Sequence, residues 1–232
     1  MRVCFKTFGC TLNKFDTLMA ERLVSGSGRY VVVDGEDEAD IVVVNTCGVK
    51  KQTEDRVISY LRRLAENGRV KVVVAGCLPS INLERLVREV RADAVIGPSP
   101  GPRIIEVLDR VAAGERVFEP WSGGSSPLVP PADGERRVTE PIGICFGCLD
   151  RCAFCATRFA RSTLSSVPVE DVVRHVRECL RRGVDKPQVG QEVARRLHRG
   201  LRREQAPLPL PPHTGAVRQQ QGAEDHAQGT HG

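Results

Sequence analysis

Apolar and polar residues follow two alternating patterns along residues 1–115. Runs such as DIVVVNTC (40–47) and VKVVVAGC (70–77) are apolar almost throughout, which is typical of strands covered on both faces. In TEDRVISYLRRLAENG (53–68) the apolar residues recur every three or four positions, which predicts an amphipathic helix capped by Thr53 and ended by Gly68. We expect further strands at 2–8, 30–33 and 93–97 and further helices at 13–26, 81–90 and 103–114. The alternation predicts an α/β fold with a doubly wound parallel sheet.

The pattern changes after residue 115. Residues 116–140 are rich in Pro, Gly and Ser and have no period, so we interpret them as a linker. Residues 141–186 begin a second domain with a cysteine-rich loop and a helix at 167–183, in which we expect His175 to be solvated. We expect no strand in KPQ (186–188). Residues 187–232 contain no Ile, Phe, Met, Tyr or Trp, and we expect them to be disordered.

Charge and hydropathy exclude some classes of protein. The 34 basic and 29 acidic residues leave a net charge of only +5, so no face is obliged to bind nucleic acid on that ground. No apolar run approaches the roughly 18 residues of a membrane span. The first residues, MRVCFKTFGC, lack the charged head and apolar region of a signal peptide. We therefore expect a cytoplasmic protein with no membrane and no DNA partner.

Three of the nine cysteines occupy equivalent positions. Cys10, Cys47 and Cys77 each follow a predicted strand and each lies next to a glycine. Parallel strands end at one edge of a sheet, where such folds bind ligands, so we expect the three thiols to share one site. In a reducing compartment clustered thiols favour metal binding or catalysis over disulfides.

Other residues near these positions allow a plainer interpretation. Asn13, Asp16 and Asn45 either support the shared site or act as caps and turn residues. Cys4 and Cys179 lie in a strand pattern and a helix pattern, and we interpret both as core residues.

A second group of cysteines is local. Cys148, Cys152 and Cys155 form the pattern CxxxCxxC, with Cys145 three residues ahead. Three thiolates on a tight loop can bind three irons of a four-iron cluster and leave the fourth iron open. With Cys145 the same residues could form a four-thiolate zinc site, although the three-residue gap is short for zinc. The spacing favours iron and sulfur, and Cys145 then becomes a strand residue.

The motifs together resemble a known family, the radical S-adenosylmethionine methylthiotransferases that modify tRNA. The resemblance covers about residues 1–185 and rests on TFGCTLNKFDT, VVNTCGVKKQTEDR, VVVAGCLP and GCLDRCAFC followed by ARS. GCTLN is most similar to the archaeal and eukaryotic branch that acts on N6-threonylcarbamoyladenosine beside the anticodon. The related isopentenyladenosine and ribosomal-protein enzymes share the same skeleton.

The resemblance implies two 4Fe-4S clusters, S-adenosylmethionine, a tRNA partner and an electron donor. Cys10, Cys47 and Cys77 match the ligands of the auxiliary cluster. Cys148, Cys152 and Cys155 match those of the radical-generating cluster, and Phe154 matches the aromatic residue that lies against the adenine of the cofactor. The implied enzyme uses a 5′-deoxyadenosyl radical to take hydrogen from carbon 2 of the target adenine, to which a methylthio group is then transferred.

The resemblance is incomplete beyond residue 186. The family's radical domain is a partial barrel of about six strand–helix units, and only its beginning is found here. We therefore expect a truncated or frameshifted chain with impaired turnover and weak tRNA binding. The alternative is a non-catalytic module that binds zinc or an iron–sulfur cluster.

Overall fold

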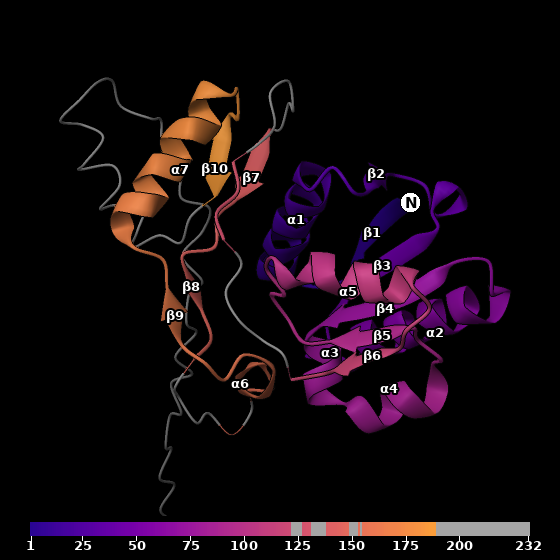
Figure 1. Ribbon diagram of the computed structural model, residues 1–232. Helices are drawn as coiled ribbons and strands as arrows, with labels where there is room; N and C mark the ends of the chain where they lie inside the picture. Colours follow the sequence, from indigo (N-terminus) through magenta and orange to yellow (C-terminus); the bar gives the residue numbers. More distant parts are fainter. Residues whose placement is uncertain (122–126, 131–137, 149–152, 154, 189–232) are drawn as a thin grey trace, which may run out of the picture.

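The computed structural model describes residues 1–121, 127–130, 138–148, 153 and 155–188 (Figure 1). Its main feature is a six-stranded sheet in which every neighbouring pair of strands is parallel. The strands lie in the order β2-β1-β3-β4-β5-β6. Their bounds are β1 (Arg2–Thr7), β2 (Val31–Val33), β3 (Ile41–Thr46), β4 (Lys71–Gly76), β5 (Ala94–Ile96) and β6 (Val117–Glu119).

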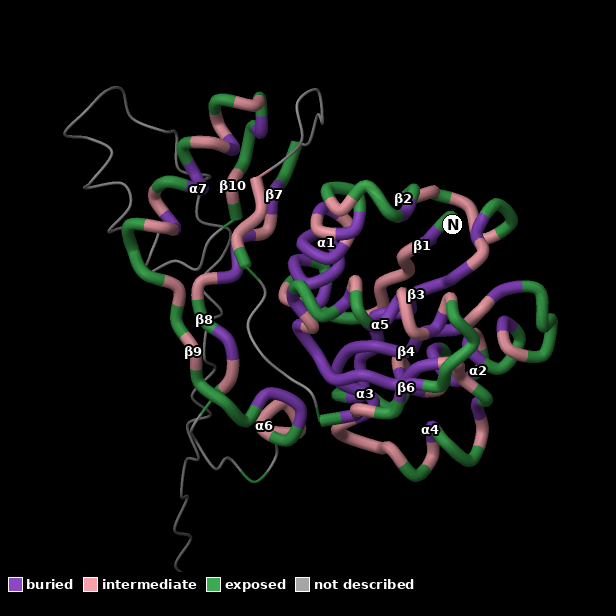
Figure 2. Tube along the Cα trace, in the orientation of Figure 1, coloured by how far each residue is buried: buried purple, intermediate pink, exposed green. Residues whose placement is uncertain are grey.

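Helices cover both faces of this sheet. On one face, strand residues such as Val43 and Val73 pack against α1 (Thr11–Gly26) and α5 (Arg103–Ala112). On the other, Val42 and Val44 pack against α2 (Lys51–Asn67), α3 (Cys77–Ile81) and α4 (Leu83–Glu89). Successive side chains of a strand point into two separate cores, and this explains why the apolar runs are continuous. β3 is buried along its whole length (Figure 2). The predicted doubly wound α/β fold is confirmed.

Several boundaries differ from the sequence prediction. β6 lies inside the predicted linker, where a three-residue strand at the sheet edge leaves no periodic pattern. The predicted helix at 81–90 is α4, which begins after Asn82, and Asn82 caps it by accepting a hydrogen bond from the Arg85 N–H. A separate short helix that was not predicted, α3, precedes it. Thr53 is not the cap of α2, which begins after Lys50. Gly68 does end that helix, with φ 62°, as expected.

The second segment is built from short elements. β7 (Thr139–Pro141) pairs in parallel with β10 (Lys186–Gln188), and β8 (Cys145–Phe146) pairs antiparallel with β9 (Ser165–Ser166). The helices are α6 (Thr157–Ala160) and α7 (Val169–Arg181). The strand at KPQ corrects our expectation. Pro187 is tolerated because the ladder uses the Lys186 N–H and the Gln188 carbonyl on either side of it.

Helix α1 is the surface on which this second segment docks. Phe15 and Phe146 pack with ring centroids 5.7 Å apart, and Met19 joins them in a small apolar cluster. The buried Arg22 of α1 pairs with the buried Glu140 of β7. In the part of the chain that the structure describes, none of the helices combines the length and apolar character needed to cross a bilayer. The tail predicted to be disordered lies, from residue 189, outside the described residues.

Candidate metal centre

The structure brings Cys10, Cys47 and Cys77 to the same edge of the sheet. Cys10 precedes α1, Cys47 follows β3 directly, and Cys77 is the first residue of α3 directly after β4. β1, β3 and β4 are adjacent and parallel, so their carboxyl ends lie together. Across the sheet, the chain passes from β1 to β2 on one side and then to β3 on the other side of β1. A doubly wound sheet binds ligands at such a reversal of the strand order. Cys47 and Cys77 are buried and Cys10 is exposed.

Asn13 lies among these thiols. Its side-chain oxygen Oδ1 accepts a hydrogen bond from Cys10 Sγ at 3.5 Å and lies 4.0 Å from Cys77 Sγ. Its Nδ2 donates to the Thr46 carbonyl at 2.9 Å and to Asn45 Oδ1 at 3.2 Å. Asn13 has no exposed surface. Asn13 and Asn45 are therefore part of the site and do not cap helices with their side chains.

The glycines beside the cysteines permit a close approach of the strand ends. A Cβ on Gly9 would lie 2.9 Å from Cys47 Cβ and 3.0 Å from Asn13 Nδ2. A Cβ on Gly76 would lie 2.4 Å from both Asn45 Oδ1 and the Thr46 carbonyl oxygen. A side chain at either glycine would therefore push apart the loops that carry Asn13 and the cysteines.

The spacing of the thiols indicates what they can hold. In the described residues, the only group of metal-binding side chains whose ligand atoms all lie within 4.8 Å of one another is Glu140, His175 and Cys179. The sulfurs of Cys10, Cys47 and Cys77 therefore do not all lie within 4.8 Å of one another, although those of Cys10 and Cys77 both lie within 4.0 Å of Asn13 Oδ1. A single tetrahedral zinc ion, with Zn–S distances of about 2.3 Å, needs closer sulfurs. A polynuclear iron–sulfur core, which binds each thiolate through a different iron, fits this donor set better.

Burial raises the pKa of the Cys77 thiol, and the charge and hydrogen bond of Arg161 act in the opposite direction. The neighbouring Cys47 and Cys10 add to the upward shift. A metal site built here releases protons when it forms, because thiolates and not thiols are the ligands. Arg161 is the positive group that favours the thiolate of Cys77.

The local cysteine group is partly described. The N–H of Cys148 donates to the Arg161 carbonyl at 3.2 Å. Hydrogen bonds from the Thr157 side chain and from the N–H groups of Thr157 and Arg158 lower the pKa of the Cys155 thiol. Cys145 lies in β8, as expected for a strand residue. Cys152 and Phe154 lie outside the described residues, so their predicted roles remain predictions.

The structure also adds residues whose roles the sequence did not predict. Arg161 belongs to the ARS run after the cysteine loop, and its buried guanidinium pairs with Asp16. Ser99, from the turn after β5, donates to Asp16 Oδ1 at 2.8 Å. The ARS run was the only signal for Arg161, and no local pattern could have linked it to Asp16, which is 145 residues away. Cys4 and Cys179 are fully buried, as expected of core residues.

Comparisons with known proteins place this site in a family. The model of "Uncharacterized protein family UPF0004" matches residues 2–97. A "Probable threonylcarbamoyladenosine tRNA methylthiotransferase" of Pyrococcus horikoshii is 33% identical over 186 residues, which are 79% of this chain and 43% of that protein. Over this part of its length, the chain is similar to proteins named as tRNA methylthiotransferases.

Other methylthiotransferases match the same part of the chain. The "Threonylcarbamoyladenosine tRNA methylthiotransferase" of Danio rerio is 32% identical over 191 residues, or 79% of this chain and 34% of its own length. A "tRNA-2-methylthio-N(6)-dimethylallyladenosine synthase" of Ruegeria sp. is 30% identical over 191 residues, which are 79% of this chain and 43% of that protein. The chain therefore spans less than half the length of these curated relatives.

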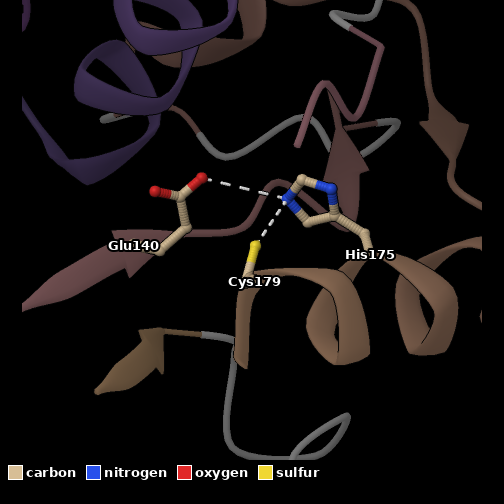
Figure 3. A group of neighbouring side chains, drawn as sticks. All are labelled: Glu140, His175 and Cys179. Atoms are coloured by element: carbon tan, nitrogen blue, oxygen red, sulfur yellow. Dashed lines mark hydrogen bonds and ion pairs between the residues drawn. The ribbon is translucent and has the colours of Figure 1, made fainter. Parts of the chain in front are cut away.

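A separate buried group lies under α7 (Figure 3). His175 Nε2 is 3.4 Å from Cys179 Sγ and 3.9 Å from Glu140 Oε1. Our expectation that His175 is solvated is wrong, because its side chain is only 3% exposed. Both oxygens of Glu140 accept hydrogen bonds from Arg22, at 2.5 and 3.0 Å. A cation here would have to displace a buried guanidinium, so we interpret the group as a structural network.

This network predicts a loss of stability in acid. Burial, and then the charge of Arg22, lowers the pKa of His175 to about 4, whereas an unfolded histidine titrates near 6.5. The stability contributed by neutral His175 is complete above pH 6.5 and is lost as the pH falls towards 4, because only the unfolded chain takes up the proton. The free energy of unfolding should fall by about 3 kcal/mol over this pH range because of His175.

The measurement compares urea unfolding of the unsubstituted chain and of His175→Gln at pH 7.5 and pH 4.5. The substituted chain should lose less stability between the two pH values, since it lacks this titration. Cys179, Glu140 and Arg22 are present in both chains, so their effects cancel in the comparison. Equal losses would show that His175 is not held neutral.

Proposed function

We propose that this chain holds the two metal centres of a methylthiotransferase that adds a methylthio group to carbon 2 of N6-threonylcarbamoyladenosine in tRNA. The observation that carries the proposal is the position of Cys10, Cys47 and Cys77 at one edge of the sheet, where Asn13 lies against the sulfurs of Cys10 and Cys77. We choose the threonylcarbamoyladenosine substrate because of the GCTLN motif and the names of the Pyrococcus and Danio relatives. Relatives named as dimethylallyladenosine synthases are equally identical to the chain, at 33%, so the substrate needs its own test.

The chain's own residues divide the work between two places. Cys10, Cys47 and Cys77 would hold one 4Fe-4S cluster, and Asn13 fixes the loops that carry them. Cys148, Cys152 and Cys155 would hold the other cluster, and Phe154 would lie against the adenine of S-adenosylmethionine. When bound, the clusters and this cofactor would supply the sulfur, the electron from an external donor and the radical chemistry.

The lowered pKa of Cys155 supports its role as a ligand, since hydrogen bonds from Thr157 and Arg158 stabilise the thiolate that iron requires. Cys145 is not needed in this assignment. It is an exposed residue of β8, and its sulfur accepts a hydrogen bond from Ser166 Oγ at 3.8 Å.

The test counts iron and sulfide in the full 232-residue chain after reconstitution without oxygen. We expect about eight irons and eight sulfides per chain, the content of two four-iron clusters. Cys47→Ala and Cys155→Ala should each lose about half. Cys4→Ala is the matched control, because Cys4 is a fully buried thiol of β1 whose Sγ lies 3.4 Å from the Asp34 carbonyl oxygen. It should keep the full content.

One bound zinc with no sulfide would contradict this proposal and support the non-catalytic module. The substrate is tested separately by incubating the reconstituted chain with S-adenosylmethionine, dithionite and tRNA that carries either modified adenosine. Mass spectrometry of the nucleosides should find the methylthio group on threonylcarbamoyladenosine. A methylthio group found only on dimethylallyladenosine would overturn the finer assignment and leave the family assignment intact.

A further inference from the structure

Arg161 is a buried cation between the two cysteine groups. It follows α6, which packs against α3 (Figure 1). Its side chain is only 4% exposed. A guanidinium buried without partners costs several kcal/mol, so the groups around Arg161 identify what it is placed to hold.

Three side chains from the N-terminal domain surround this guanidinium. Asp16 Oδ2 lies 2.5 Å from one terminal nitrogen of Arg161, and Ser99 Oγ lies 2.6 Å from the other. The charge of Arg161 also reaches the Cys77 thiol at the start of α3, where it lowers the pKa of that thiol against the effect of burial. Because Ser99 also donates to Asp16, the guanidinium has a fixed orientation towards Cys77.

Ser99 is held in an unusual backbone conformation. Its φ is 51°, which among the described residues is the only positive value outside glycine. A non-glycine residue in this region is strained and is retained where the surrounding structure holds it in place. Here the strain places the Ser99 hydroxyl against both Asp16 and Arg161, which indicates that the orientation of Arg161 matters to the site.

The main chain of Arg161 reaches the second cysteine group. Its carbonyl accepts the N–H of Cys148 at 3.2 Å. The adjoining Gly147, with φ 81°, approaches Thr163 so closely that a Cβ would lie 1.9 Å from the Thr163 carbonyl oxygen. Arg161 therefore places its charge beside α3, the helix that begins at Cys77, and contacts Cys148 through its backbone.

We propose, on the basis of the function proposed above, that Arg161 is a positioning residue that joins the two cysteine groups and raises the reduction potential of the cluster held by Cys10, Cys47 and Cys77. A positive charge near a ligand sulfur stabilises the more negative, reduced state of a cluster. Arginine suits this role because it keeps its charge and its planar fork reaches three acceptors at once.

The test uses the full chain carrying Cys155→Ala, so that only the three-cysteine cluster is present. A redox titration monitored by electron paramagnetic resonance gives the ratio of reduced to oxidised cluster at a fixed potential. Arg161→Gln should lower this ratio at least tenfold, which is about 59 mV for a one-electron couple. Arg161→Lys and Ser99→Ala should lower it less, because the first keeps the charge and the second only releases the orientation.

Arg174→Gln is the matched control. It removes an arginine charge from the same segment, but the Arg174 side chain is 75% exposed and pairs with Asp171 on the surface of α7. The ratio of reduced to oxidised cluster should not change in this variant. In the metal-free chain with its cysteines intact, hydrogen exchange of peptides that contain Gly147 and Cys148 should be faster in Arg161→Gln and unchanged in Arg174→Gln.

An unchanged potential in Arg161→Gln would overturn the inference. If that variant does not hold a cluster, unchanged potentials in both Arg161→Lys and Ser99→Ala would overturn it equally. Failure of the proposed function would give a different result from failure of this inference. In that case the chain carrying only Cys155→Ala would bind no iron and sulfide at the three cysteines, even with Arg161 intact.

Discussion

Gly76→Ala should destabilise the N-terminal domain by about 3 kcal/mol or more, and disturb the three-cysteine site with it. Gly76 has φ 99° and ψ −155°, a conformation essentially restricted to glycine, and forcing another residue into it costs roughly 1–3 kcal/mol. The added Cβ would also lie 2.4 Å from the Thr46 carbonyl oxygen and 2.6 Å from the Thr46 nitrogen. These are main-chain atoms of β3, which cannot move aside as a flexible side chain can.

Gly68→Ala is the matched control for this substitution. Gly68 also has a positive φ, 62°, but a Cβ there would meet no atom within 4 Å. Its cost should be the left-handed conformation alone, about 1–2 kcal/mol. Urea unfolding followed by far-ultraviolet circular dichroism measures both variants. Equal losses would show that the contact with β3 has no energetic consequence and that only the backbone conformation matters.

The sequence was sufficient to predict the convergence of the cysteines, because this depends on a regular feature. Apolar runs such as those before Cys47 and Cys77 identify parallel strands, and parallel strands must end at a common edge. The role of Asn13 could not be predicted in the same way. Asparagine near the start of a helix usually serves the backbone, and only the packed structure shows that its amide turns to the cysteines instead.

The burial of His175 could have been predicted from the helix spacing, but the neighbouring arginines suggested the opposite. Val172, Val176 and Cys179 lie on the buried face of α7, and residue 175 falls on the same face by the three- and four-residue spacing. The arginines at 174 and 177 favoured a solvated interpretation. The spacing was the better guide, because a buried histidine can stay neutral beside a buried ion pair and its position is set by the helix period.

The contacts between the two segments lie beyond what local patterns contain. Asp16 and Arg22 are both on α1, yet their partners Arg161 and Glu140 lie 145 and 118 residues further along the chain. In the first pair α1 carries the acidic residue, Asp16, and in the second pair it carries the basic residue, Arg22. The short strands β6 and β10 were missed for a related reason, since three residues at a sheet edge are stabilised by their neighbours and not by a pattern of their own.

Glu140→Gln should cost about 3–5 kcal/mol and release β7 and α7 from α1. The substitution keeps the shape of the side chain but leaves the charge of Arg22 buried without its counter-ion, and removing one partner of a buried pair has a cost of this size. The side chains of Arg22 and Glu140 are 6% and 0% exposed. A neutral acceptor, such as the Val129 carbonyl that accepts from Arg22 at 2.7 Å, does not neutralise this charge.

Glu84→Gln is the matched control, because Glu84 pairs with Arg88 at 3.8 Å on the surface of α4, with side chains 91% and 64% exposed. An exposed pair of this kind contributes at most about 1 kcal/mol. Urea unfolding gives the stability, and hydrogen exchange of α7 reports whether the second segment has separated. In the double variant Arg22→Met with Glu140→Gln, most of the loss should be recovered, since no unpaired charge remains buried. A double variant as unstable as Glu140→Gln alone would contradict the electrostatic explanation and assign the loss to packing around β7.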